Sequence, residues 1–162
     1  MPLVKSALLT LALAALTPLF QGTLMAQTEA APKQSSENAK IYIQPTLPEI
    51  LSIMKAQNYN VELYEDTEVI AWFFADDHIS LISTDKPTSL NFYTYVEGDE
   101  FTFEDANKWN RDYIYSKTYL DDDNDPALEL DLDLTGGVTE ARIISFLENC
   151  EDSFKAWIKE AS

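Results

Sequence analysis

Cysteine and histidine are almost absent from this chain of 162 residues, which contains a single Cys, Cys150, and a single His, His78. One cysteine permits no disulfide within the chain, so the fold has to be held by its hydrophobic core. A structural zinc site needs several Cys or His ligands, and a Ser-His-Asp triad would depend on His78 alone. Cys150 could pair with another chain, but it falls within an apolar helical stripe, which favours a buried free thiol.

Glycine is also rare, with four residues, at positions 22, 98, 136 and 137. Their spacing forms no phosphate-binding G-x-x-x-x-G-K-[ST] loop, no dinucleotide-binding G-x-G-x-x-G and no G-x-S-x-G nucleophile turn. These absences argue against nucleotide-dependent enzymes and ordinary hydrolases. We therefore expect a protein that is not an enzyme, with no catalytic residue, no cofactor and no metal site.

Positive charge is scarce as well. Eleven Lys and Arg residues stand against 28 Asp and Glu residues, which gives a net charge of −17. Nucleic acids and anionic lipid surfaces attract clustered Lys and Arg, so neither is expected as a partner. The negative charge suits cationic partners, and it is equally explained by solubility and loosely held divalent cations.

The first 26 residues have the pattern of a secretory signal peptide. Lys5 supplies a positive start, an apolar run extends from Ala7 to Phe20, and Ala26 offers a small residue before a cleavage site. The run is too short for a comfortable membrane span, so no stable membrane insertion is expected after cleavage. An uncleaved anchor and cleavage after Ala30 are the alternatives. The pattern predicts a periplasmic or secreted protein.

The rest of the chain divides into a linker and one domain. Residues 27–39 are small and polar, which predicts a disordered linker, and residues 40–162 are expected to form a single domain. A capping box at Thr46 and Glu49 predicts a first helix that ends near Gln57. A second box, at Thr102 and Asp105, predicts a short helix that ends by Asn110.

Strand patterns fill the intervals between the helices. The runs 60–66, 69–75, 79–83 and 89–96 precede the second helix, and the runs 111–120 and 127–134 follow it. A last helix is expected over 139–161, with the core stripe Ile143, Phe146, Leu147, Cys150, Phe154, Trp157 and Ile158. This order predicts an α+β fold, an antiparallel sheet of about five strands with helices packed on it, in the order α-β-β-β-α-β-β-α.

The acidic segment 121–125, "DDDND", could be a calcium loop or a hairpin turn. An EF-hand requires Gly at its sixth position and Glu at its twelfth, where this chain has Pro126 and Leu132. We therefore expect a hairpin with a four-residue loop from Asp122 to Asp125, in which Tyr119 faces Leu128 and Tyr115 faces Leu132. Weak binding of divalent cations at this turn stays open.

An enzymatic alternative rests on carboxylates. Glu129, Asp131 and Asp133 alternate along one strand face, where they are expected to be solvated. A cell-envelope hydrolase would instead need a pocket that unites at least two residues of a wider set, and a divalent-cation-binding protein would use the acidic hairpin. That set is Asp76, Asp77, His78, Asp131 and Asp133.

The segment from Ala106 to Thr139 resembles the YbjN domain family, whose members are described as bacterial sensory-transduction regulators. The resemblance rests on "NKWN", "YLDDDNDP", "LELDLDL" and "GGVT". It implies a fold similar to type III secretion chaperones, which often dimerise, and a binding or regulatory module without catalytic residues. The chain departs from many relatives in its signal peptide, and it has Asn124 where the family turn often has Gly.

Aromatic and Arg residues are the best candidates for contact with a partner, because interfaces favour Trp, Tyr and Arg. The predicted interaction surface comprises Tyr93, Tyr95, Trp109 and Arg111, although Trp109 could instead pack the second helix onto the sheet. We expect an exported, non-enzymatic module that binds a protein or peptide partner and forms a homodimer.

Overall fold

A six-stranded antiparallel sheet with the strand order β2-β3-β4-β5-β7-β6 forms the centre of the computed structural model. The structure describes residues 39–64, 68–84, 88–98 and 100–161. The strands are β2 (Val61–Tyr64), β3 (Val69–Phe73), β4 (Ile79–Ser83), β5 (Ser89–Tyr95), β6 (Lys117–Leu120) and β7 (Pro126–Asp133). A second, two-stranded sheet pairs β1 (Ile41–Tyr42) with β8 (Val138–Thr139). The predicted signal peptide, and the predicted linker except Ala39, lie outside the described residues.

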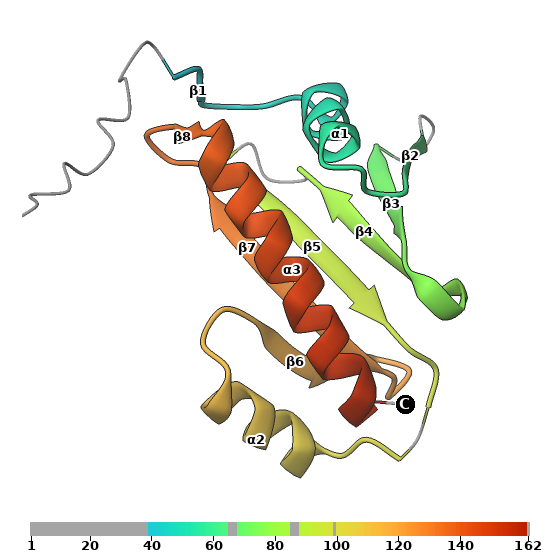
Figure 1. Cartoon of the computed structure of the whole chain (residues 1–162). Helices are drawn as coiled ribbons and strands as arrows, with labels where there is room; N and C mark the ends of the chain where they lie inside the picture. The colour runs from blue at the N-terminus through green and yellow to red at the C-terminus, as the bar shows by residue number, and fades with distance from the viewer. Residues whose placement is uncertain (1–38, 65–67, 85–87, 99, 162) are drawn as a thin grey trace, which may run out of the picture. The chain divides into compact units, whose positions relative to one another are not determined.

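Three α-helices accompany the sheets, α1 (Leu47–Ala56), α2 (Phe103–Asp112) and α3 (Glu140–Ala161), together with a 3-10 turn, η1 (Ala75–Asp77). α3 lies along β5 and β7, α1 lies next to β2 and β3, and α2 lies beside β6 (Figure 1). The predicted α+β class is confirmed. The sheet has one strand more than expected, and the pair β1 and β8 was not anticipated. No helix in the described part of the chain is long and apolar enough to cross a membrane.

Both predicted capping boxes are present. The Thr46 backbone amide donates to Glu49 Oε2 at 3.0 Å, and the Glu49 amide donates to Thr46 Oγ1 at 3.4 Å. Hydrogen bonds from Lys40 and from the Thr46 backbone hold the pKa of Glu49 at about 2. The box at Thr102 and Asp105 closes in the same way. α2 runs to Asp112, two residues beyond its predicted end at Asn110.

The core lies between one face of the sheet and α3. The row Ile70, Ile82, Phe92 and Leu130 crosses four strands, and all four side chains are buried. From α3, the buried side chains are Ile143, Phe146, Leu147, Cys150, Phe154, Trp157 and Ala161. This confirms the predicted stripe except for Ile158, which is only partly buried. Cys150 is a buried free thiol, and burial raises its pKa.

The hairpin between β6 and β7 differs from its prediction by one residue. Tyr119 is opposite Ala127 and Thr118 is opposite Leu128, so the loop has five residues, Asp121–Asp125. Thr118 is buried, and Tyr119, expected opposite Leu128, lies on the other face of the sheet. The predicted pair of Tyr115 with Leu132 is wrong, because β6 begins only at Lys117.

Two local features explain this register. Within the loop, the Asp121 carboxylate accepts from the backbone amides of Asp123 and Asp125 at 2.9 and 3.0 Å, so Asp121 belongs to the turn. Inside the core, the Thr118 hydroxyl donates to the Ala127 carbonyl at 2.6 Å and accepts from Trp157 Nε1 at 2.9 Å. Because the buried Thr118 hydroxyl has two hydrogen-bond partners, the cost of removing it from water is offset.

Candidate interaction surfaces

One face of the six-stranded sheet faces away from α1 and α3, and we call it the free face. Its central row, Ala71, Leu81, Tyr93, Glu129 and Lys117, alternates with the buried row that packs under α3. On either side of this row the free face also carries Phe73, Ile79, Asn91, Tyr95, Tyr119, Asp131 and Asp133. Because side chains alternate along a strand, every second residue of β3, β4, β5, β6 and β7 contributes to it.

Apolar side chains form the middle of the free face. Tyr95 is 50% exposed and Ile79 is 44% exposed, while Phe73, Leu81 and Tyr93 are half-buried. The rings of Tyr93 and Tyr95 lie 6.2 Å apart between centroids. Both tyrosines lie on the face of β5 opposite the buried Leu90 and Phe92, and their role as contacts stays a prediction.

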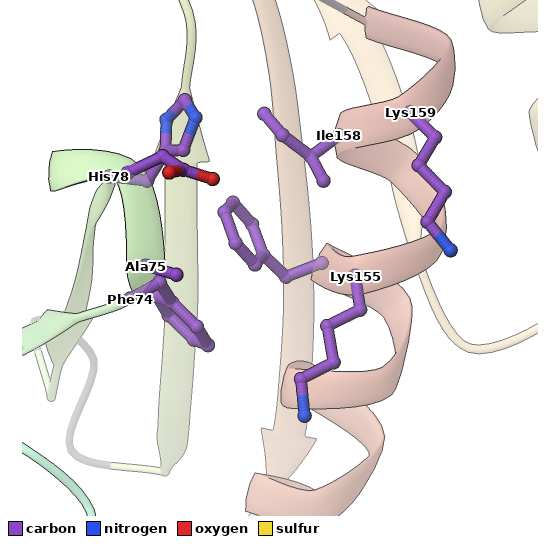
Figure 2. A pocket seen from close by; sticks show the side chains of 8 residues that line it. Phe74, Ala75, His78, Lys155, Ile158 and Lys159 are labelled. Atoms are coloured by element: carbon purple, nitrogen blue, oxygen red, sulfur yellow. The ribbon is translucent and has the colours of Figure 1, made fainter.

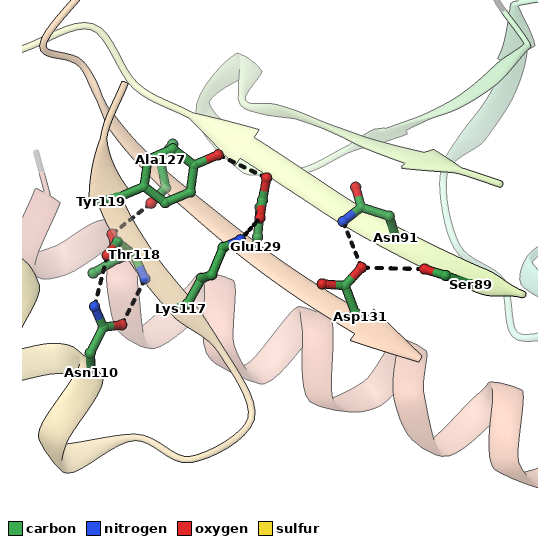
Figure 3. Close-up of polar contacts among 9 residues, drawn as sticks. All are labelled: Ser89, Asn91, Asn110, Lys117, Thr118, Tyr119, Ala127, Glu129 and Asp131. Carbon is green, nitrogen blue, oxygen red and sulfur yellow. Dashed lines mark hydrogen bonds and ion pairs between the residues drawn. The ribbon is translucent and has the colours of Figure 1, made fainter. Parts of the chain in front are cut away.

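Carboxylates border this apolar middle, each with its own polar partners (Figure 3). Glu129 accepts from the Tyr119 hydroxyl at 2.8 Å and forms an ion pair with Lys117. Asp131 accepts from Asn91 Nδ2 at 3.1 Å and from Ser89 Oγ at 3.4 Å. Burial and the bond to Glu129 raise the pKa of Tyr119. The hydrogen bonds of the two carboxylates therefore involve different side chains.

The other two predicted contact residues lie elsewhere. Trp109 is 1% exposed, stacks on Tyr113 at 3.7 Å between ring centroids, and donates from Nε1 to Ser116 Oγ at 3.0 Å. The structure therefore places Trp109 in the core, as the packing alternative predicts, and it offers no surface to a partner. Arg111 is exposed on α2, where Nε pairs with the Asp112 carboxylate at 3.0 Å.

Sequence reasoning missed a second apolar surface, which we call the exposed loop: Tyr113, Ile114 and Tyr115, between α2 and β6. These side chains are 40%, 82% and 68% exposed. They were assigned to a strand because aromatic residues alternate there. The loop is recognised only once the end of α2 at Asp112 and the start of β6 at Lys117 are known.

Asn110 closes the edge of the sheet beside this loop. Its side chain donates to the Thr118 carbonyl at 2.9 Å and accepts from the Thr118 amide at 2.9 Å (Figure 3). β6 is the last strand of the sheet, so these two backbone groups would otherwise be open to another strand. The Asn110 side chain thus blocks the pairing of a further strand with β6 at Thr118.

Two hollows flank His78, which lines both. The first, of about 440 Å³, lies between η1 and the end of α3, and Phe74, Phe154 and Ile158 form its apolar wall, with Asp76, Lys155 and Lys159 as its charged groups (Figure 2). The second, of about 420 Å³, is lined by Asp77, His78, Ile79, Tyr95, Val96 and Glu97.

These hollows bear on the hydrolase alternative. Each unites His78 with one neighbouring aspartate, Asp76 or Asp77, and neither contains Asp131 or Asp133. Among the described residues, no hydrogen bond joins the His78 ring to a carboxylate or a hydroxyl. The ring meets that of Phe154 edge-on, with 5.8 Å between the ring centroids.

The acidic turn does not gather metal ligands. Asp121 is used by two backbone amides, and Asp125 Oδ1 accepts from the Gly98 amide at 3.1 Å. Among the described residues, no group of three His, Cys, Asp or Glu side chains is placed to hold a metal ion. Asn124 has a φ of 66°, which Asn tolerates, so the turn forms without the family's Gly.

The fold and its surfaces define an α+β domain with helices on one sheet face and exposed apolar side chains on the other. The model of the YbjN family, described as "Putative bacterial sensory transduction regulator", matches residues 49–161. The chain therefore belongs to the YbjN family. No curated protein matches it.

A solved structure supports the fold. The chain is similar to the crystal structure of YbjN from E. coli, described as "a putative transcription regulator", with a TM-score of 0.64 and 18% sequence identity. The similarity covers 75% of this chain and 94% of that chain. At this identity, the likeness shows that the two chains share a fold.

Proposed function

We propose that this protein is an exported regulatory module that acts through contact with other proteins and not through catalysis. The observation that carries the proposal is the free face, where Ile79 and Tyr95 are exposed beside Leu81 and Tyr93. Apolar side chains grouped on one surface mark interaction sites in soluble proteins. Membership of a family of regulators supports this reading.

Export is supported by Lys5, the apolar run and Ala26. Expression of the full chain in a bacterial host should give a periplasmic or secreted product whose N-terminal residue is Gln27. Sequencing of the N-terminus after cell fractionation checks this. A product that begins at Met1 and stays in the cytoplasm contradicts export and leaves the contact surfaces unaffected.

We further propose that two copies associate through the exposed loop. Between residues 108 and 117 the chain has three basic residues, Lys108, Arg111 and Lys117, and one acidic residue, Asp112. This segment therefore has more basic than acidic residues, although the whole chain has a net charge of −17, and two copies can meet there with little repulsion. A two-fold dimer places the same patch of both chains in contact, so Ile114 would meet its own copy or a neighbour.

Light scattering over a series of concentrations tests the dimer. The wild type should give twice the chain mass, and Ile114→Ser should raise the dimer dissociation constant about a hundredfold, because the dimer contains two copies of Ile114 and each exposed Ile that becomes buried contributes ~1.5 kcal/mol. Ile43→Ser is the matched control, since Ile43 is 66% exposed on the segment that follows β1. A monomeric wild type, or equal effects of the two substitutions, contradicts the proposed dimer.

A further inference from the structure

The free face has a chemistry that selects its partner, and the inference drawn from it rests on the proposed function. We propose that the free face binds a polypeptide segment in which Lys or Arg residues accompany large apolar side chains. The long basic side chain is received by the hollow next to Tyr95. The occupant is another protein, not a second copy of this chain.

The apolar middle of the free face is continuous across three strands. Phe73 on β3 is opposite Ile79 on β4, and Leu81 on β4 is opposite Tyr93 on β5. Tyr95 follows on β5, with its ring near that of Tyr93. We call these five side chains the apolar strip. An extended segment that lies on the strip can place alternate side chains against it, since the side chains of a strand repeat every second residue.

Acidic groups enclose this strip. On β7, Glu129 is opposite Tyr93 and Asp131 is opposite Asn91, and on β2, Glu62 is opposite Ala71. Lys117 is the one basic residue on the described strands, and its ammonium is paired with Glu129. A partner segment therefore meets apolar side chains with a border of negative charge.

The hollow of about 420 Å³ at one end of the strip provides an anchor point. Ile79 and Tyr95 form its apolar side, and Asp77 and Glu97, both exposed, supply two carboxylates. Lys and Arg side chains have apolar stems and charged ends, so the stem can pack on Tyr95 while the charge reaches the carboxylates. The Tyr95 ring adds a favourable cation–π contact.

Charge also decides against a second copy as the occupant. Two free faces in contact would bring Glu129, Asp131 and their equivalents together, with one Lys117 on each side. Like charges at an interface are unfavourable, and each chain carries a net charge of −17. A cationic segment gains from the same charges.

Labelled synthetic peptides test this inference by fluorescence anisotropy. In three matched peptides, Lys, Gln or Glu alternates with Tyr and Val. We expect saturable binding of the Lys peptide, weaker binding of the Gln peptide and no binding of the Glu peptide. Tyr95→Ser should weaken binding of the Lys and Gln peptides alike, because it removes the apolar contact that both share.

A matched pair of variants separates the hollow from general attraction to an acidic protein. Asp77→Asn with Glu97→Gln should weaken binding of the Lys peptide about fivefold, since each of the two exposed charge pairs contributes about 0.5 kcal/mol. Glu148→Gln with Asp152→Asn removes the same charge from exposed sites on α3 and should have little effect. Equal effects of the two pairs overturn the anchor at the hollow.

The outcomes also separate the inference from the proposed function. If the Gln and Lys peptides bind equally well and Tyr95→Ser weakens both, the free face is a contact surface without a preference for cations, and the inference fails alone. If none of the peptides binds, the free face loses its role and the proposed function loses its main support.

Discussion

At the scale of single residues, the buried hydroxyl of Thr118 favours the observed register of β6 against β7. Thr118→Val should cost about 1–3 kcal/mol of unfolding free energy, because it leaves Trp157 Nε1 without an acceptor in the core. Ser80→Ala is the control: Ser80 is fully buried and, among the described residues, its hydroxyl has no hydrogen-bond partner, so its removal should be neutral or stabilising. Urea unfolding of both variants measures the difference. Equal effects of the two substitutions would mean that the hydrogen bonds of Thr118 make no net contribution to stability.

At the scale of secondary-structure elements, α2 protects the last strand of the sheet. Asn110→Ala should lower the unfolding free energy by about 1–2 kcal/mol and increase aggregation, because the amide and carbonyl of Thr118 lose their partner at the β6 edge. Asn107→Ala is the matched control, since Asn107 is exposed in the same helix. Urea unfolding and light scattering after incubation measure the two effects. An Asn110 variant that behaves like the Asn107 variant would show that the edge is protected by other means.

Elements that depend on nearby residues were predictable from the sequence. Each capping box joins two residues three positions apart, and the stripe of α3 repeats within one helix, so local spacing was sufficient. The register of β6 depended on Trp157, which is 39 positions from Thr118 and was assigned only to a general core. The exposed loop was missed for the same reason: an aromatic alternation looks like a strand until the extent of α2 is known.

At the scale of the whole molecule, the net charge of −17 should give the two proposed associations opposite responses to salt. Raising the salt concentration from about 0.1 M to about 1 M shortens the Debye length from about 10 Å to about 3 Å. The dimer should become tighter, because screening reduces repulsion between two acidic chains that meet at a weakly charged loop. Binding of the Lys peptide should become weaker, because screening reduces its attraction to the border of the free face.

Light scattering and anisotropy on the same protein preparation measure both responses. The Gln peptide is the control, since apolar contact should not weaken as salt increases. If dimerisation and Lys-peptide binding both weaken with salt, the dimer is held by opposite charges, and the exposed loop is not its main contact. If both strengthen, the partner of the free face is recognised by its apolar side chains, and the acidic border serves solubility alone.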